Sequence, residues 1–302
     1  MVFRLIPKKG EYMKNALHYN SMARALRHFF QDKKGFVEIP AQSRLSILAA
    51  CEQPETITQF TLDNIVYPCP QTGQMWLEHE LLMNPDWRGC FCITTSYRDE
   101  PNPIEGRHLR IFPMFEFEAH GTFDDLKALE EELLIHLGFQ IPIPISYEDV
   151  CKKYEAQTIE HEHEQTLWKE LGNCISLEKF PSRTSPFWNM KYAGNGLYNK
   201  IDILLHGMET IGSAERETDA YKMREEFFAI SQGKYSQLLF NQFGKERVLK
   251  ELDAYLAFNM FPRFGGGIGL TRLERAFELS GLFEQSLPEI TSRIIQQPQI
   301  SL

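Results

Sequence analysis

The chain has 302 residues, and its 43% hydrophobic and 12% aromatic content is enough for a well-buried globular core. Its 32 basic and 41 acidic residues give a net charge of −9, which argues against a general nucleic-acid-binding surface. No apolar run approaches the length of a membrane span, and no apolar signal segment opens the chain. We therefore expect a cytoplasmic protein without membrane contact.

Two predicted strands flank a polar loop. Cys92–Glu100 and His108–Glu118 have strand patterns, and the Pro/Asn/Gly-rich residues Pro101–Gly106 join them. Alternation places Arg98 and Glu100 on one face of the first strand. One face of the second strand carries Arg110, Phe112, Met114, Glu116 and Glu118. Such a hairpin can bind a phosphate, an exocyclic amine and a flat base, although an ordinary hairpin with surface charges is the simpler alternative.

The middle of the chain predicts helices. Residues 124–137 have the pattern of an amphipathic helix that packs on a sheet. Residues 140–182 begin with the Pro-alternating stretch Ile141–Pro144 and predict a small helical insertion. Within it His161-Glu-His-Glu164 suggests a metal site, but residues two apart do not share a helix face. A solvated helix over Tyr154–Leu171 is the better interpretation.

A glycine-rich segment precedes the last predicted helix. Residues 264–275 read Phe-Gly-Gly-Gly-Ile-Gly-Leu-Thr-Arg-Leu-Glu-Arg, and helical apolar spacing begins at Leu273. Missing side chains at Gly265, Gly266, Gly267 and Gly269 allow a ligand or another backbone to approach closely. A strand that leads into a helix bearing Arg272 can hold a phosphate, whereas a glycine run alone is often only a site of tight packing.

The predicted hairpin and the glycine-rich segment together resemble motifs 2 and 3 of the class II aminoacyl-tRNA synthetases, in the subclass that activates aspartate, asparagine and lysine. Phe29–Pro40 resembles motif 1, and Thr72–Glu78 is similar to a segment of the asparaginyl enzymes. Asp202–Glu217 resembles the acidic hairpin of the aspartyl and asparaginyl enzymes. The resemblance implies an α+β fold with a mostly antiparallel sheet flanked by helices, and a homodimer formed through motif 1.

The resemblance also implies an ATP site. Arg98 matches the arginine that holds the α-phosphate and the amino-acid carboxylate, and Arg272 matches the arginine on the γ-phosphate. Glu100 matches a glutamate near adenine, and Phe112 matches the ring that stacks on it. His108 matches the loop histidine that faces the outer phosphates. Arg98 and Arg272 are the predicted catalytic residues.

Asp202 and Glu209 match the pair that binds Mg²⁺, and Glu209 also belongs to the predicted ATP site. The chemistry is reasonable without the resemblance. Carboxylates on both arms of a hairpin that turns near His206-Gly207 can converge on a hard cation, and ATP requires one.

Four residues are the predicted amino-acid site. Arg216 lies where aspartyl and asparaginyl enzymes place the arginine that binds the side-chain carboxylate or amide. Gln74 and, more loosely, Glu52 match positions near the substrate α-amino group. Leu77 replaces the lysine of aspartyl enzymes and Glu78 follows it, which favours an asparaginyl type of pocket.

The implied reaction is adenylation of an amino acid, and the acceptor is the open question. Thr271 stands where synthetases usually carry Asp or Glu, and Ser213-Ala214 replaces Gly-Ser. The glycine motif instead resembles that of ammonia-dependent asparagine synthetases built on this fold. We expect residues 1–302 to be one catalytic domain without an anticodon-binding domain, which makes ammonia the first hypothesis. The alternatives are transfer of aspartate or asparagine to a tRNA, a carrier protein or a metabolite, and a catalytically silent paralogue.

Overall fold

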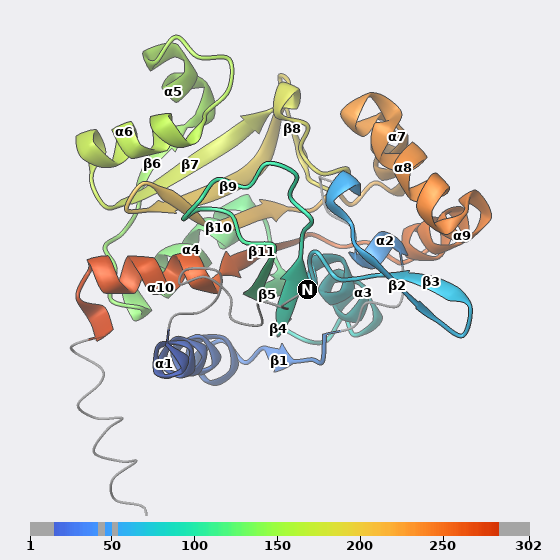
Figure 1. Cartoon of the computed structure of the whole chain (residues 1–302), viewed down its shortest axis with the longest axis horizontal. Coiled ribbons are helices and arrows are strands. Elements are labelled where there is room, and N and C mark those ends of the chain that lie inside the picture. Colours follow the sequence, from blue (N-terminus) through green and yellow to red (C-terminus); the bar gives the residue numbers. More distant parts are fainter. Residues whose placement is uncertain (1–14, 42–45, 50–53, 284–302) are drawn as a thin grey trace, which may run out of the picture.

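The computed structural model describes residues 15–41, 46–49 and 54–283, and within them the chain forms one nine-stranded sheet and one separate hairpin (Figure 1). The strands of the large sheet are β1 (Val37–Glu38), β4 (Gly89–Tyr97), β5 (Ile111–His120), β6 (Ile143–Ser146), β7 (Cys174–Pro181), β8 (Tyr192–Gly194), β9 (Leu197–Leu205), β10 (Met208–Glu215) and β11 (Arg263–Gly269). The hairpin consists of β2 (Gln59–Leu62) and β3 (Ile65–Pro68).

Helices surround this sheet. They are α1 (Ala16–Arg27), η1 (His28–Lys33), α2 (Ser46–Ala49), η2 (Pro54–Thr56), α3 (Gln74–Met83), α4 (Phe123–His136), α5 (Tyr147–Lys153), α6 (His161–Leu171), η3 (Ser182–Thr184), α7 (Ala220–Ala229), η4 (Ile230–Gly233), α8 (Lys234–Phe243), α9 (Lys245–Leu256) and α10 (Leu270–Leu279). In the part of the chain that the structure describes, none of these helices combines the length and apolarity that a membrane span requires.

The large sheet is mostly antiparallel, as predicted. Its strand order is β1-β4-β5-β11-β10-β9-β7-β6, and β8 pairs with β9. The pairs β1–β4 and β6–β7 are parallel, and the other pairs are antiparallel. The α+β class and the motif 1 pattern, a helix followed by a short strand, are therefore confirmed.

The two faces of the sheet differ in what covers them. Side chains alternate along β5, so Phe115 and Phe117 point to one face and meet Phe30, with ring centroids 5.0 Å apart in each pair. Helices α1, α4 and α10 pack on this face and form the largest apolar core. On the opposite face α3 packs against β4 and β5, and α6 packs against β9 and β10. The surface between α3 and α6 remains available for a site.

The central hairpin matches the prediction except at its tip. Strands β4 and β5 pair from Gly89 to Tyr97, where the register ends at Ile111. The prediction that the first strand reaches Glu100 is wrong, because the N–H of Asp99 bonds the carbonyl of Thr56 at 2.9 Å and draws the chain away from the ladder. Arg98 and Glu100 therefore lie at the start of the loop.

The segment 140–182 contains strands as well as helices. It supplies β6 and β7, which extend the large sheet, and α5 and α6, which pack on it. The predicted helix over Tyr154–Leu171 is shorter, because Glu155 has a positive φ of 51° and the helix begins at His161. Within the described residues, His161 and His163 belong to no group of three potential metal ligands.

Glu130 is a buried carboxyl group between α4 and the sheet. Its Oε1 accepts a hydrogen bond of 2.6 Å from the hydroxyl of Ser213, and its Oε2 has no hydrogen-bond partner among the described residues. Burial raises the pKa of Glu130 to about 8, so the carboxyl group is protonated at neutral pH.

We predict that the free energy of unfolding depends on pH through Glu130. A raised pKa means that the folded state holds a proton the unfolded state has lost, so stability falls as the pH rises from about 4.5 to about 8. Glu130→Gln keeps a hydrogen-bonding group and removes the titration, so we expect it to flatten this fall by the order of 2–4 kcal/mol. Urea unfolding at several pH values measures the effect. Glu131→Gln on the same helix is the control, and an unchanged slope in Glu130→Gln would contradict the assignment.

Candidate active site

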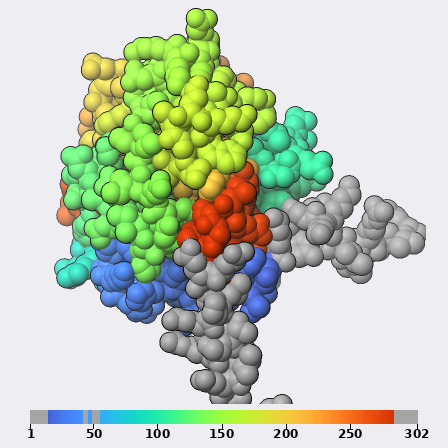
Figure 2. All heavy atoms as spheres, turned by 90° about the vertical axis from the view of Figure 1, so that its left-hand side faces the viewer, coloured from blue at the N-terminus to red at the C-terminus, as the bar shows by residue number. Residues whose placement is uncertain are grey.

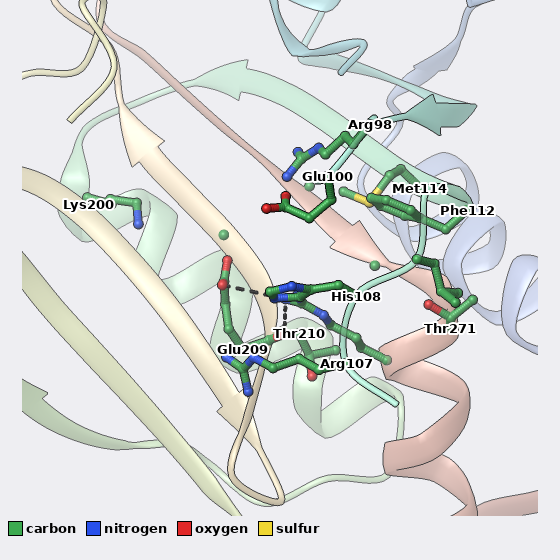
Figure 3. A pocket seen from close by; sticks show the side chains of 15 residues that line it. Arg98, Glu100, Arg107, His108, Phe112, Met114, Lys200, Glu209, Thr210 and Thr271 are labelled. Atoms are coloured by element: carbon green, nitrogen blue, oxygen red, sulfur yellow. Dashed lines mark hydrogen bonds and ion pairs between the residues drawn. The ribbon is translucent and has the colours of Figure 1, made fainter. Parts of the chain in front are cut away.

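A cavity of about 320 Å³ lies on the sheet face between α3 and α6 (Figure 3). Strands β5, β9, β10 and β11, the β4–β5 loop and the start of α10 provide its walls. The lining residues include all six that the sequence predicts for ATP, namely Arg98, Glu100, His108, Phe112, Glu209 and Arg272. Residues distant in the chain thus meet in one cavity.

One end of the cavity carries an aromatic ring. Phe112 and Met114 lie side by side on β5, with Glu100 beside them (Figure 3). The guanidinium carbon of Arg98 lies 5.7 Å from the centroid of the Phe112 ring. A flat ring, a carboxylate and a cation in this order suit a purine base followed by a phosphate.

The other end is rich in cations. Arg272 donates from Nη1 to the carbonyl oxygen of Glu209 at 2.8 Å, and the same nitrogen lies 3.5 Å from the Glu209 carboxylate. Arg107 and Lys200 also line this end. Several positive groups within one cavity suit a polyanion such as a triphosphate.

His108 is neutral at pH 7. Burial lowers its pKa, and Arg272 lowers it further because a second positive charge nearby is unfavourable. The backbone N–H of Ile104 points at its Nδ1 from 3.3 Å, which leaves Nε2 as the N–H donor.

Asp202 and Glu209 approach each other across Gly212. A Cβ atom placed on Gly212 would lie 3.1 Å from Oε1 of Glu209 and 3.6 Å from Oδ1 of Asp202. Burial alone would raise the pKa of Glu209, but Arg272 and other cations outweigh it and hold the pKa below its ordinary value. Two carboxylates around a position without a side chain fit a hard divalent cation. Lys200, 2.9 Å from Asp202, balances the charge of the pair in this structure.

The glycines of β11 form the floor of the cavity. Gly267 and Gly269 line it, and a Cβ on Gly267 would lie 2.8 Å from Met114 and 3.1 Å from Gln74. A Cβ on Gly265 would lie 1.7 Å from the carboxylate of Glu118. Glycine is therefore required for close approach at Gly265, and a side chain at Gly267 would displace Met114 and Gln74.

Arg216 lies next to this floor and is almost fully buried. Its Nε and Nη2 donate to the two carboxylate oxygens of Glu118, each at 3.0 Å, and Nη2 also donates to Oε1 of Gln74 at 2.9 Å. Arg216 and Gln74, both predicted for the amino-acid site, are thus in direct contact. Arg216 already carries a carboxylate partner from the protein itself.

Glu78 lies behind this pair, and none of the three residues lines the cavity. Its Oε2 accepts from Nη2 of Arg263 at 2.7 Å and from the hydroxyl of Tyr255 at 2.6 Å. Its Oε1 accepts from Asn189 at 2.6 Å and lies 3.4 Å from Nε of Arg216. Glu78, Glu118, Arg216 and Arg263 form a buried group of alternating charge, which we call the charge quartet.

One predicted site residue remains to be placed. Glu52 lies outside the described residues, so its predicted role stays a prediction. Arg107, Lys200 and Arg263 were not predicted for the site, and Glu118 was expected only on the ligand-facing side of the hairpin. The partners of Glu118 and Arg263 are distant in the chain, and no local pattern marks them.

Solved structures with the same fold are class II synthetases. An asparaginyl-tRNA synthetase from Pyrococcus horikoshii, complexed with asparaginyl-adenylate, has a TM-score of 0.69 and 18% identity over 85% of this chain and 63% of that chain. The asparaginyl-tRNA synthetase of Entamoeba histolytica, also with asparaginyl-adenylate, has a TM-score of 0.67 and 18% identity over 86% and 62%. A putative aspartyl-tRNA synthetase from Leishmania major Friedlin has a TM-score of 0.66 and 16% identity over 86% and 61%.

The fold is therefore that of a class II aminoacyl-tRNA synthetase catalytic core, and this chain spans about three-fifths of the length of these structures. No protein with a curated function matches the sequence significantly. A profile of the class II tRNA synthetases for D, K and N matches residues 3–278. The chain belongs to this family, whose members are AMP-forming ligases.

We predict that Glu78→Gln lowers the free energy of unfolding by about 3 kcal/mol, because it leaves the buried guanidinium of Arg263 without its counter-charge. Urea unfolding measures the change. Glu80→Gln on the same helix is the control, since Glu80 is only partly buried. Equal stability of both variants would show that the charge quartet does not support the fold.

Proposed function

We propose that the protein adenylates aspartate with ATP and transfers the aspartyl group to ammonia, which yields asparagine and AMP. The observation that carries the proposal is the single cavity in which Arg98, Phe112 and Arg272 meet, with the glycine floor open beneath. The family supports the adenylation step in particular, since the asparaginyl enzymes of similar fold were solved with an aminoacyl-adenylate.

In the first step an oxygen of the side-chain β-carboxylate of aspartate attacks the α-phosphorus of ATP. A new P–O bond forms, and the bond to the β-phosphate oxygen breaks to release pyrophosphate. Arg98 would neutralise the α-phosphate and Arg272 the outer phosphates. The attacking carboxylate is already ionised at pH 7, so the protein supplies orientation and charge, and no base is needed.

Asp202 and Glu209 are the residues proposed to hold Mg²⁺. Bound there, the ion would neutralise charge on the phosphates during pyrophosphate release. Neutral His108 would donate a hydrogen bond to an outer phosphate without adding charge.

In the second step the nitrogen of ammonia attacks the side-chain carbonyl carbon of the β-aspartyl-adenylate. The C–O bond to AMP breaks, and the nitrogen loses a proton to give the amide. Thr271 supports this acceptor, because it lines the cavity at a position where the tRNA-charging enzymes usually carry an acid.

The alternative is activation of aspartate or asparagine and transfer to a tRNA, a carrier protein or a metabolite. The pairing of Arg216 with Glu118 is the observation that favours asparagine. A guanidinium that already holds a carboxylate has less to gain from a second one, whereas an amide can bond both groups. We further propose that the protein is a homodimer, as the motif 1 pattern suggests.

The product distinguishes these functions. We expect asparagine and AMP from aspartate, ATP and Mg²⁺ only when ammonium is added, as measured by mass spectrometry. Asparagine-dependent pyrophosphate exchange without any asparagine synthesis would replace the ammonia reaction with the alternative. An absence of exchange with all amino acids would contradict both.

We predict that Arg98→Ala lowers the rate of adenylate formation by about 100-fold, because it removes a cation from the reacting phosphate. Pyrophosphate exchange measures this rate. Arg110→Ala is the matched control, since Arg110 lies in the same loop but does not line the cavity. Equal rates in the two variants would contradict the role of Arg98.

A further inference from the structure

Helix α6 contacts Arg107, which lines the cationic end of the cavity, and it is firmly docked on the turn between β9 and β10. Gln165 donates from Nε2 to the carbonyl of Gly207 at 2.6 Å, in the turn between β9 and β10. The ring of Trp168 meets His206 edge-on at 5.6 Å, and Arg275 of α10 lies 6.0 Å from its centroid. Figure 2 shows this side, where the red surface of α10 meets the yellow-green residues above it.

Glu164 points from this helix toward the β4–β5 loop. Its Oε2 accepts a hydrogen bond of 2.6 Å from Nη2 of Arg107. The two side chains are only 11% and 12% exposed, so water weakens this ion pair much less than a surface pair. A residue of the 140–182 segment thus holds a residue of the cavity wall.

Arg107 needs such a support because of where it lies. Residues 101–106, which precede it, are exposed. A long arginine side chain on an exposed loop has many rotamers, and binding must order it. The anchored carboxylate of Glu164 fixes one nitrogen of the Arg107 guanidinium before a ligand binds. Arginine has donors on three nitrogens, so Nε and Nη1 can still bond a ligand.

The geometry points to Glu164 as a positioning residue that presents Arg107 to the outer phosphates of ATP. The inference rests on the proposed function for the identity of the nucleotide. Arg107 lies beside Glu209, on the side of the cavity away from Phe112 and Met114 (Figure 3). Arg107 therefore contributes to binding of the β- and γ-phosphates and does not contribute to binding of the base or the α-phosphate.

A competing role for Glu164, in which it blocks the site, predicts the opposite change in ATP affinity. A carboxylate beside the phosphates repels them, so a residue that only blocks the site would weaken ATP binding in the wild-type protein. Removing its charge would then tighten the binding. A supporting residue weakens the binding when its charge is removed, which makes the direction of the change decisive.

The test compares Glu164→Gln with Glu162→Gln, a control on the exposed face of the same helix. Calorimetry with Mg²⁺ measures the affinity for ATP and for AMP, which lacks the outer phosphates. We expect Glu164→Gln to weaken ATP binding about tenfold and to leave AMP binding unchanged, since one charge-assisted contact is lost. Glu162→Gln keeps wild-type affinity for both.

Arg107→Ala provides an independent variant. It weakens ATP binding without changing AMP binding, and Glu164→Gln adds nothing further in its presence, because the two residues act as one unit. Thermal unfolding by circular dichroism shows whether each variant is folded.

Three results would overturn the inference. ATP binding to Glu164→Gln that is as tight as in the wild type, or tighter, excludes a supporting role. Equal losses for ATP and AMP indicate a general distortion of the site. A wild-type protein that binds neither nucleotide overturns the proposed function, and the inference falls with it.

Discussion

The charge quartet is the interaction on which the site depends. Its four residues come from α3, β5, the position directly after β10 and the start of β11, so it joins α3 to the strands that border the cavity. The charges of two carboxylates and two guanidiniums balance, and all four side chains are almost fully buried, so the loss of any one leaves a buried charge unpaired. Gln74 bonds Arg216, so the position of its side chain is set by the same group.

The two ends of the cavity rest on different supports. The base end lies on β5, in the middle of the sheet, where neighbouring strands hold the backbone on both sides. The cationic end depends on a loop, on the first turn of α10 and on α6. Under the proposed function, the sheet would fix the nucleoside, and the loop and the helix would hold the phosphates.

How much the sequence predicts depends on the distance between partners in the chain. Arg98, Phe112 and Arg272 belong to local motifs, and the structure places all three in the cavity. Pairs such as Arg107–Glu164 and Glu78–Arg263 join residues that lie 57 and 185 positions apart. No periodicity marks such pairs, because only the folded sheet brings them together. The end of β4 was mispredicted for the same reason, since its backbone partner Thr56 lies far upstream.

The bare strand β11 has a further consequence for the free protein. At Gly267 and Gly269 the cavity floor is backbone without side chains, and the ends of the Met114 and Gln74 side chains lie close to Gly267. A nucleotide bound in the cavity would add contacts to this backbone. Ligand binding and conformational stability are then linked, and the cellular concentration of the nucleotide would help to set how much of the protein is folded.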